Sequence, residues 1–217
     1  MKKLVLILLS VLALVACTPI DSNSKETIVL KDLEDAEGIA ALADLGRTLG
    51  LGAVDASEST IASGNVELVE GCNTFRYSGT EDSATATLSM RGCKEAGLTM
   101  NGELRIAWNM SSFTMNGSVT ATAYEPEIDE TITVTLDIKN VAVSIDGNNI
   151  ASTTIDMIID ISSDSAEGTF TVATTSPITV DRESLFEVAS SGSLRLTDSK
   201  GNTVTATYLN GDITVTQ

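Results

Sequence analysis

The 217-residue sequence predicts a mainly β protein, in which one long, curved antiparallel sheet, shaped like a half-barrel, packs on a single N-terminal helix. From Val66 onward apolar and polar residues alternate with period two, and threonine and β-branched residues are abundant, which is typical of strands. A helical pattern occurs in one stretch, residues 32–50. Glycines at core-facing positions of two strands are expected to curve the sheet. A closed barrel or a two-sheet sandwich is the alternative architecture.

The first sixteen residues have the pattern of a secretory signal peptide. Lys2 and Lys3 precede an apolar run, Leu4 to Leu14, which is too short to span a membrane as a stop-transfer helix. Residues 17–25 form a polar tether. Residues 26–217 are expected to form a single β-rich domain that includes the helix.

The helix predicted near 32–50 carries Ile39, Leu42 and Leu45 at three-residue steps on one face. Acidic residues crowd its start, Arg47 lies in its last turn and glycines end it. Two internal glycines weaken it by about 1 kcal/mol each, so it needs a surface on which to pack. We expect that surface to be the protein core, since interfacial membrane helices usually have a basic polar face and this one is acidic.

Cys72 and Cys93 lie on two predicted strands joined by a turn at Asp82-Ser83. If residues whose numbers sum to 165 are paired, Phe75 lies opposite Met90 and the two cysteines lie opposite each other, at a separation that a disulfide bridges. An exported protein meets an oxidising compartment, and the sequence has no Cys-x-x-Cys redox motif. A structural disulfide is therefore predicted.

A near-repeat occurs at Leu98-Thr99-Met100-Asn101-Gly102-Glu103-Leu104 and Phe113-Thr114-Met115-Asn116-Gly117-Ser118-Val119. Asn-Gly usually marks a hairpin turn, yet the apolar alternation continues through both pairs. We predict two long strands joined near 109–112, with both glycines on the core face. Such glycines permit the close approach of another backbone, for which the helix is the expected candidate and a ligand the alternative.

The remaining strands follow from the same alternation. Apolar residues lie at even positions from Ile132 to Ile138 and at odd positions from Val141 to Ile145, which predicts a β-bulge near Lys139-Asn140. A return strand over 155–161 and two shorter strands at 170–172 and 178–180 follow. Asn210-Gly211 is predicted to be the turn of a C-terminal hairpin, preceded by a strand around 194–196 and a turn over 198–202.

Composition excludes several classes of function. Thirteen basic and thirty acidic residues give a net charge of −17, or −19 once Lys2 and Lys3 are removed with the leader, so nucleic acid is not expected as a partner. Histidine, the commonest general base and transition-metal ligand, is absent. No nucleophile elbow, phosphate loop or dinucleotide fingerprint occurs. We therefore expect no enzymatic activity, cofactor or metal.

Two kinds of acidic motif resemble catalytic or metal-binding sequences. Glu81-Asp82 and Asp129-Glu130 are paired carboxylates of the kind that glycoside hydrolysis uses, but both lie in or near predicted turns and are interpreted as solvated charges. The stretches 146–149 and 198–202 resemble calcium loops in composition. Neither has the closing bidentate glutamate, so both are interpreted as turns.

Leu14-Val15-Ala16-Cys17 resembles the lipobox of bacterial lipoproteins. The resemblance implies a diacylglycerol thioether on Cys17, cleavage before it and N-acylation, and two or three acyl chains anchor a protein stably. Thr18 follows, where an aspartate would imply retention at the inner membrane, so the resemblance implies the outer membrane. The cysteine pair followed by an Asn-Gly-containing strand is similar to uncharacterised threonine-rich β lipoproteins of Gram-negative bacteria, which implies no particular activity.

The sequence thus predicts a non-enzymatic, lipid-anchored envelope lipoprotein that is a structural component or binds an envelope protein partner. The alternative function is a carrier of an apolar ligand such as an acyl chain. If the helix does not fill the half-barrel, a pocket is expected to be lined by five apolar residues: Met100, Ile106, Trp108, Phe113 and Met115.

Overall fold

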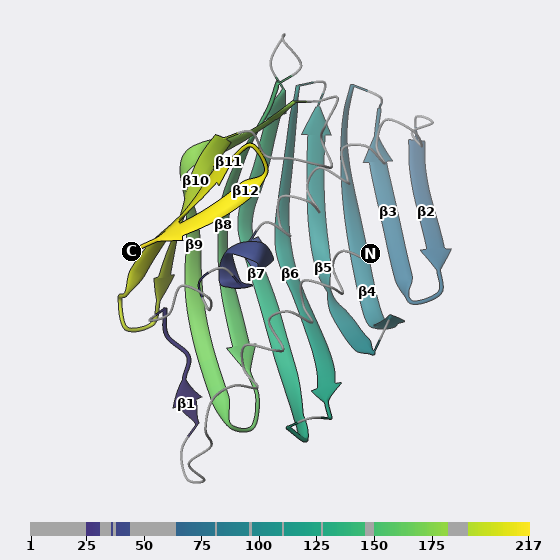
Figure 1. Cartoon of the computed structure of the whole chain (residues 1–217). Coiled ribbons are helices and arrows are strands. Elements are labelled where there is room, and N and C mark those ends of the chain that lie inside the picture. The colour runs from purple at the N-terminus through teal and green to yellow at the C-terminus, as the bar shows by residue number, and fades with distance from the viewer. Residues whose placement is uncertain are drawn as a thin grey trace.

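The computed structural model describes residues 25–30, 36, 38–43, 64–80, 82–95, 97–109, 111–126, 128–145, 150–181 and 191–217. These residues form one twelve-stranded sheet that is not closed (Figure 1). The strands are β1 (Glu26–Thr27), β2 (Gly64–Glu70), β3 (Asn73–Gly79), β4 (Ser83–Glu95), β5 (Leu98–Asn109), β6 (Ser112–Glu125), β7 (Glu130–Ile145), β8 (Ile150–Ser162), β9 (Ala166–Asp181), β10 (Ser191–Asp198), β11 (Thr203–Leu209) and β12 (Asp212–Thr216).

Strands β2 to β12 lie side by side in chain order, each antiparallel to the next. β1 is the exception, since it pairs in parallel with the start of β9. Figure 1 shows that β10 to β12 turn across the direction of β8, so the C-terminal end of the sheet is strongly twisted. The predicted fold class, a long, curved, open antiparallel sheet with one short helix, is confirmed.

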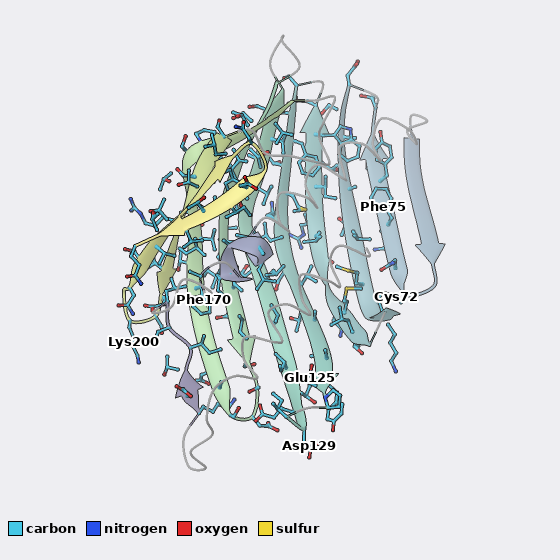
Figure 2. The ribbon with its side chains drawn as sticks, in the orientation of Figure 1. Cys72, Phe75, Glu125, Asp129, Phe170 and Lys200 are labelled. Carbon is cyan, nitrogen blue, oxygen red and sulfur yellow. A yellow bond between two sulfur atoms is a disulfide. The ribbon has the colours of Figure 1, made fainter. Side chains whose placement is uncertain are left out.

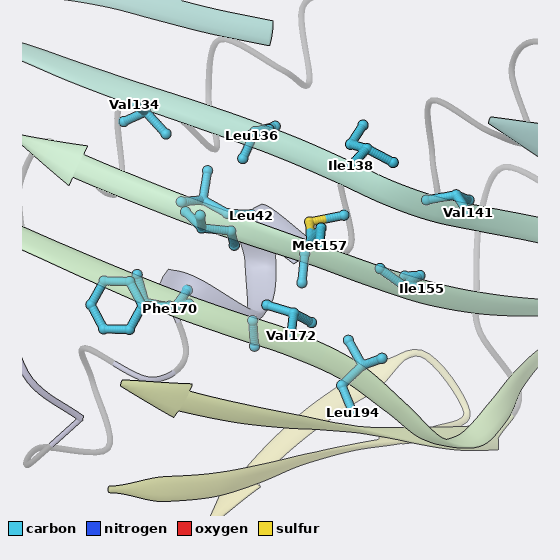
Figure 3. Close-up of a cluster of buried hydrophobic side chains, with 14 of the residues drawn as sticks. Leu42, Val134, Leu136, Ile138, Val141, Ile155, Met157, Phe170, Val172 and Leu194 are labelled. Atoms are coloured by element: carbon cyan, nitrogen blue, oxygen red, sulfur yellow. The ribbon is translucent and has the colours of Figure 1, made fainter. Parts of the chain in front are cut away.

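The helix occupies the concave face of the sheet. Helical backbone is found at residues 36 and 38–43, inside the predicted stretch, and the rest of 32–50 lies outside the described residues. Ala36, Ile39, Ala40, Leu42 and Ala43 are all buried in the same cluster as the inward side chains of the sheet. Figure 3 shows Leu42 among side chains of β7, β8 and β9. The predicted packing of the helix on the core is thus observed.

The core is built from the inward residues of alternating strands. Ile138, Met157, Phe170 and Leu194 come from four successive strands and are almost completely buried. Burial of each such side chain contributes roughly 1.5–3 kcal/mol, which is why the period-two pattern specifies which face of each strand turns inward.

The curvature of the sheet coincides with a line of irregularities across it. Register shifts occur in the β4–β5 ladder between Met90 and Cys93, in the β6–β7 ladder between Ile138 and Val141 of β7, in the β7–β8 ladder between Ile138 and Asn140, and in the β8–β9 ladder between Thr153 and Asp156. The last three adjoin one another and form one line, whereas the shift in β4 is separated from them by the unbroken β5–β6 ladder. Bulges bend the strand that carries them and increase its twist. The bulge predicted near Lys139-Asn140 is confirmed as part of this line.

The predicted register of β3 and β4 is wrong by two residues. Asn73 lies opposite Met90 and Phe75 opposite Leu88, and the connection spans Thr80 to Ser83. A shift of two leaves every side chain on its own face, so the alternation could not distinguish the two registers. The disulfide forms nevertheless, because a bulge in β4 adds a residue before Cys93.

The strands that follow β8 differ from the prediction in one place and agree with it in another. The short strands predicted at 170–172 and 178–180 are parts of one continuous strand, β9. Pro177 lies in its interior but is unpaired in the registers with both β8 and β10, so its missing N–H breaks no ladder. The C-terminal hairpin is confirmed: Tyr208 pairs with Ile213, and Asn210 and Gly211 both have positive φ, as a type I′ turn requires.

Candidate functional site

The predicted site residues fall into three groups. Cys17, the predicted lipidation site, lies outside the described residues. Cys72 and Cys93 form the predicted disulfide, with their Cα atoms 5.1 Å apart (Figure 2). It joins the turn before β3 to β4, where the Arg91 N–H also donates to the Cys72 carbonyl oxygen.

The five apolar residues proposed to line a pocket lie on the concave face. Met100, Ile106, Phe113 and Met115 are 1–7% exposed and belong to the same buried cluster as the helix, and half-buried Trp108 packs against that cluster. The Trp108 ring stacks at a tilt on Tyr77, with centroids 5.3 Å apart. These residues are therefore packing partners of the core.

The outer face of the sheet has a different character. Its side chains are mainly threonine and serine, interspersed with charged residues, and they bond across strands. Thr120 and Thr135 hydroxyls are 3.0 Å apart, and the Thr169 hydroxyl donates to Asp160 over 2.7 Å. This face is polar and regular, and such cross-strand pairs stabilise a sheet without involving its core.

A hollow of about 520 Å³ lies on the outer face over β5 and β6. Asn101, Asn116, Ser118, Thr120, Glu103 and Arg105 line it with Gly102 and Gly117. Glu103 and Arg105 form an ion pair, with Oε1 and Nε 3.1 Å apart. The lining thus combines amides, hydroxyls and one ion pair in a shallow depression that is widely open to solvent.

The near-repeat explains the form of this hollow. β5 and β6 pair antiparallel with Glu103 opposite Ser118. Residues fifteen apart in the repeat, Asn101 with Asn116 and Gly102 with Gly117, are therefore related by a local two-fold axis that passes through the Glu103–Ser118 pair. We refer to the outer-face residues of this repeat, Asn101 to Arg105 and Asn116 to Thr120, as the two-fold hollow.

The close approach predicted at the two glycines is real, but the helix does not make it. A Cβ on Gly117 would lie 2.1 Å from the Glu103 carbonyl oxygen, and one on Gly102 would lie 2.3 Å from that of Ser118. Both residues have positive φ, of 134° and 152°. The backbone of the neighbouring strand therefore occupies the place that a side chain at either glycine would need, and both glycines line the two-fold hollow.

The turn over 198–202, which resembles a calcium loop in composition, holds a structural carboxylate. Asp198 is 5% exposed and accepts four hydrogen bonds: from the N–H groups of Leu30, Lys200 and Asn202 and from the Asn202 side-chain amide, at 2.7–3.0 Å. Burial raises the pKa of Asp198, but these bonds outweigh it and hold the pKa below its usual value. Each oxygen already accepts two donors. The other calcium-like stretch, 146–149, lies outside the described residues.

The paired carboxylates predicted from sequence do not converge on one site. Asp129 accepts a hydrogen bond from the Tyr124 hydroxyl, whereas the buried Glu130 accepts one from the Ser165 hydroxyl at 2.9 Å. The Ser163 hydroxyl is the main cause of a lowered Glu130 pKa, opposed by burial and helped by Ser165 and the charge of Lys25. Of the other pair, Asp82 is exposed and Glu81 lies outside the described residues.

No family model, curated protein or solved structure matches this chain. Among the described residues, no helix has the length and apolar character needed to cross a bilayer.

The sequence did not predict the N-terminal arm, residues 25–30. Its β1 hydrogen-bonds to β9, where Glu26 N–H donates to the Ser165 carbonyl and Ile28 N–H to that of Glu167, and its end is bound by Asp198. A two-residue strand has no readable alternation. The two-fold hollow was missed as well, although the fifteen-residue spacing of two antiparallel strands contained the signal.

Proposed function

We propose that this protein is a non-enzymatic, lipid-anchored lipoprotein of the bacterial outer membrane that presents its outer β-face to an envelope protein partner. The anchor is supported by the lipobox ending at Cys17. The observation that carries the partner-binding role is the two-fold hollow, a polar recess on an exposed face that the core does not use.

The arrangement of the arm supports this role mechanically. A domain that is presented to a partner from a lipid anchor needs a firm junction between the two. Here the first described residues, Lys25 to Leu30, are held at two separate points, by β9 and by Asp198. These contacts fix the start of the domain to the sheet.

The anchor is tested by fractionating cells that express the full chain or its variants. Wild type is expected in the outer membrane, Cys17→Ser as a soluble protein, and Thr18→Asp in the inner membrane. Thr18→Asp is the matched control, because it retains the lipid and changes only the sorting signal. Cys17→Ser protein that remains in the membrane fraction would contradict the anchor.

The partner surface is tested by a photo-crosslinking amino acid at Asn116, inside the two-fold hollow, and at Thr214, which is also exposed, on β12. One discrete adduct is expected from Asn116 and none from Thr214. Arg105→Glu, which replaces the only cation lining the hollow, should abolish that adduct. Adducts that are equal at both positions, or that survive Arg105→Glu, would contradict this surface.

The alternative function, a carrier of an apolar ligand, requires space on the concave face. Met100, Phe113 and Met115 are already buried, in the same core cluster as the helix residues, so an acyl chain would have to displace side chains that are packed there. Titration of the delipidated protein with an apolar fluorescent probe separates the two functions. We expect no stoichiometric uptake, and saturable binding of one probe per chain would favour the carrier.

A further inference from the structure

The N-terminal arm determines which end of the sheet lies near the predicted anchor. Lys25 is eight residues beyond Cys17, and eight residues of fully extended chain reach about 28 Å at most. The lipid-bearing residue must therefore lie within that distance of Lys25, whatever path the chain takes between them. This step rests on the proposed lipidation of Cys17.

The arm meets the sheet at one end, which we call the anchor end and define by Lys25, Tyr124, Asp129, Glu130 and Ser163 to Ser165. Glu26 N–H donates to the Ser165 carbonyl, and the Ser165 hydroxyl donates to Glu130. The β8–β9 turn, the β6–β7 turn and β1 are thus in direct contact. Figure 1 shows all three at the lower end of the sheet, and Figure 2 labels Asp129 there.

The anchor end also carries an exposed aromatic residue. Tyr124 is 58% exposed, and its hydroxyl donates to Asp129 over 2.7 Å. Among the described residues, Leu209 is the other large hydrophobic side chain that is exposed. Leu209 lies at the opposite end, because it pairs with Ser191, which in turn pairs with Thr179 near the end of β9. A tyrosine with an apolar ring and a solvated hydroxyl is suited to the headgroup level of a bilayer.

The charge of the anchor end favours one kind of lipid headgroup over another. Exposed or half-exposed acids at and beside the anchor end are Glu26, Glu125, Asp129, Asp164 and Glu167. The described cations there are fewer: Lys25, which pairs with Glu167 at 3.9 Å, Lys94 at the end of β4, and Lys200 in the β10–β11 turn. An anionic lipid surface would be repelled by this end. Zwitterionic headgroups with an ammonium group supply hydrogen-bond donors that carboxylates accept.

We propose that the anchor end docks on a zwitterionic, amine-bearing lipid surface, with Tyr124 at headgroup level and the strands rising away from the membrane. β7 has sixteen residues and is about 50 Å long. The opposite end, with Leu209 and Trp108, therefore stands far above the lipid.

The test uses the lipidated full chain in vesicles of phosphatidylethanolamine and phosphatidylcholine whose acyl chains carry bromine near the headgroup. Trp108, the only tryptophan, is replaced by phenylalanine, and a new one is introduced as Tyr124→Trp or, as the matched control, Leu209→Trp. We expect bromine to quench the fluorescence of Tyr124→Trp about two-fold and to leave that of Leu209→Trp unchanged. Anionic lipid added to the vesicles should reduce the quenching.

Flotation of the same vesicles distinguishes a failure of the lipid anchor from a failure of the docking proposal. If the protein does not float with the lipid, the anchor itself is wrong, and with it the proposed function. If it floats but Tyr124→Trp is not quenched, or Leu209→Trp is quenched as strongly, only the docking proposal is overturned. Asp164→Trp and Asp212→Trp, at exposed positions near the same two ends, provide a second pair that does not disturb the Tyr124–Asp129 bond, and the same pattern is expected.

Discussion

Asp198, at the end of β10, joins the N-terminal arm to the β10–β11 turn through a single carboxylate. Its oxygens accept N–H donors from Leu30, which belongs to the arm, and from Lys200 and Asn202 in the β10–β11 turn. Hydrogen bonds to a charged, buried group contribute more than neutral ones, about 1.5–3 kcal/mol each. One residue therefore stabilises both a turn and the attachment of the tether.

Asp198→Asn is expected to lower the free energy of unfolding by about 2 kcal/mol at neutral pH, since the neutral amide has one acceptor oxygen and brings donors toward other donors. The folded-state pKa of Asp198 lies below the unfolded value, so the carboxylate stabilises the fold above the ordinary aspartate pKa. This contribution is lost as pH falls through the lowered folded value. Urea unfolding at a series of pH values should show the gap between wild type and Asp198→Asn narrowing in acid. A gap that is independent of pH would contradict this role.

Among the described glycines, Gly117 is the one at which an added Cβ would lie nearest to another atom. Gly117→Ala places a Cβ 2.1 Å from the Glu103 carbonyl oxygen at a positive φ, and we expect a loss of about 3 kcal/mol or more. Gly71→Ala is the control, because Gly71 also has positive φ but has open space around it, and about 1 kcal/mol is expected there. Thermal unfolding of the two variants measures the difference. Equal losses would mean that backbone strain alone, without the close approach, makes the glycine necessary.

At the scale of elements, the disulfide and the β4 bulge act together. Gly92 has φ of 63°, and its N–H donates to the Asn101 side chain, which holds the extra residue in place. The bulge reverses the alternation, so Met90 and Cys93 both turn toward the core. Without it, the sulfur of Cys93 would point to the outer face, away from Cys72.

The disulfide closes a loop between residues 21 apart, and its loss is expected to cost about 3 kcal/mol. Urea unfolding of wild type with and without reductant measures this cost. The double variant Cys72→Ser, Cys93→Ser should have the stability of reduced wild type and no response to reductant. If reduction left the unfolding midpoint of wild type unchanged, the disulfide would not be a structural staple.

The elements show where sequence reasoning succeeds. Long runs of alternation, such as those of β5, β6 and β7, identify strands and faces because burial of one face dominates their energy. The change of the apolar residues from even to odd positions also predicted the bulge at Lys139-Asn140. A register shift of two residues does not change which positions face the core, which explains the error in β3–β4. β1 is too short to have a pattern. The two-fold hollow depends on strand pairing, so it became visible only when Glu103 was placed opposite Ser118.

At the scale of the whole molecule, strands β2 to β12 pair in the order in which they follow one another in the sequence. Each strand from β3 to β11 has the preceding and the following strand as its partners, whereas β2 and β12 are paired on one side in the part of the chain that is described. Stability should therefore fall from the centre of the sheet to its edges, because an edge strand can open without breaking a second ladder. β7, β8 and β9 have two ladders each and also pack on the helix.

Amide hydrogen exchange should reveal this gradient. We expect the slowest exchange at core-facing positions of the central strands, such as Ile138 and Met157, and the fastest among strand amides in β12, around Thr214. The Asp198→Asn variant should accelerate exchange in the arm and the β10–β11 turn while leaving β7 and β8 unchanged, because the central ladders do not use that carboxylate. Protection in β12 equal to that in β7 would mean that its free edge is covered, as in a closed barrel, and the open half-barrel would then be wrong.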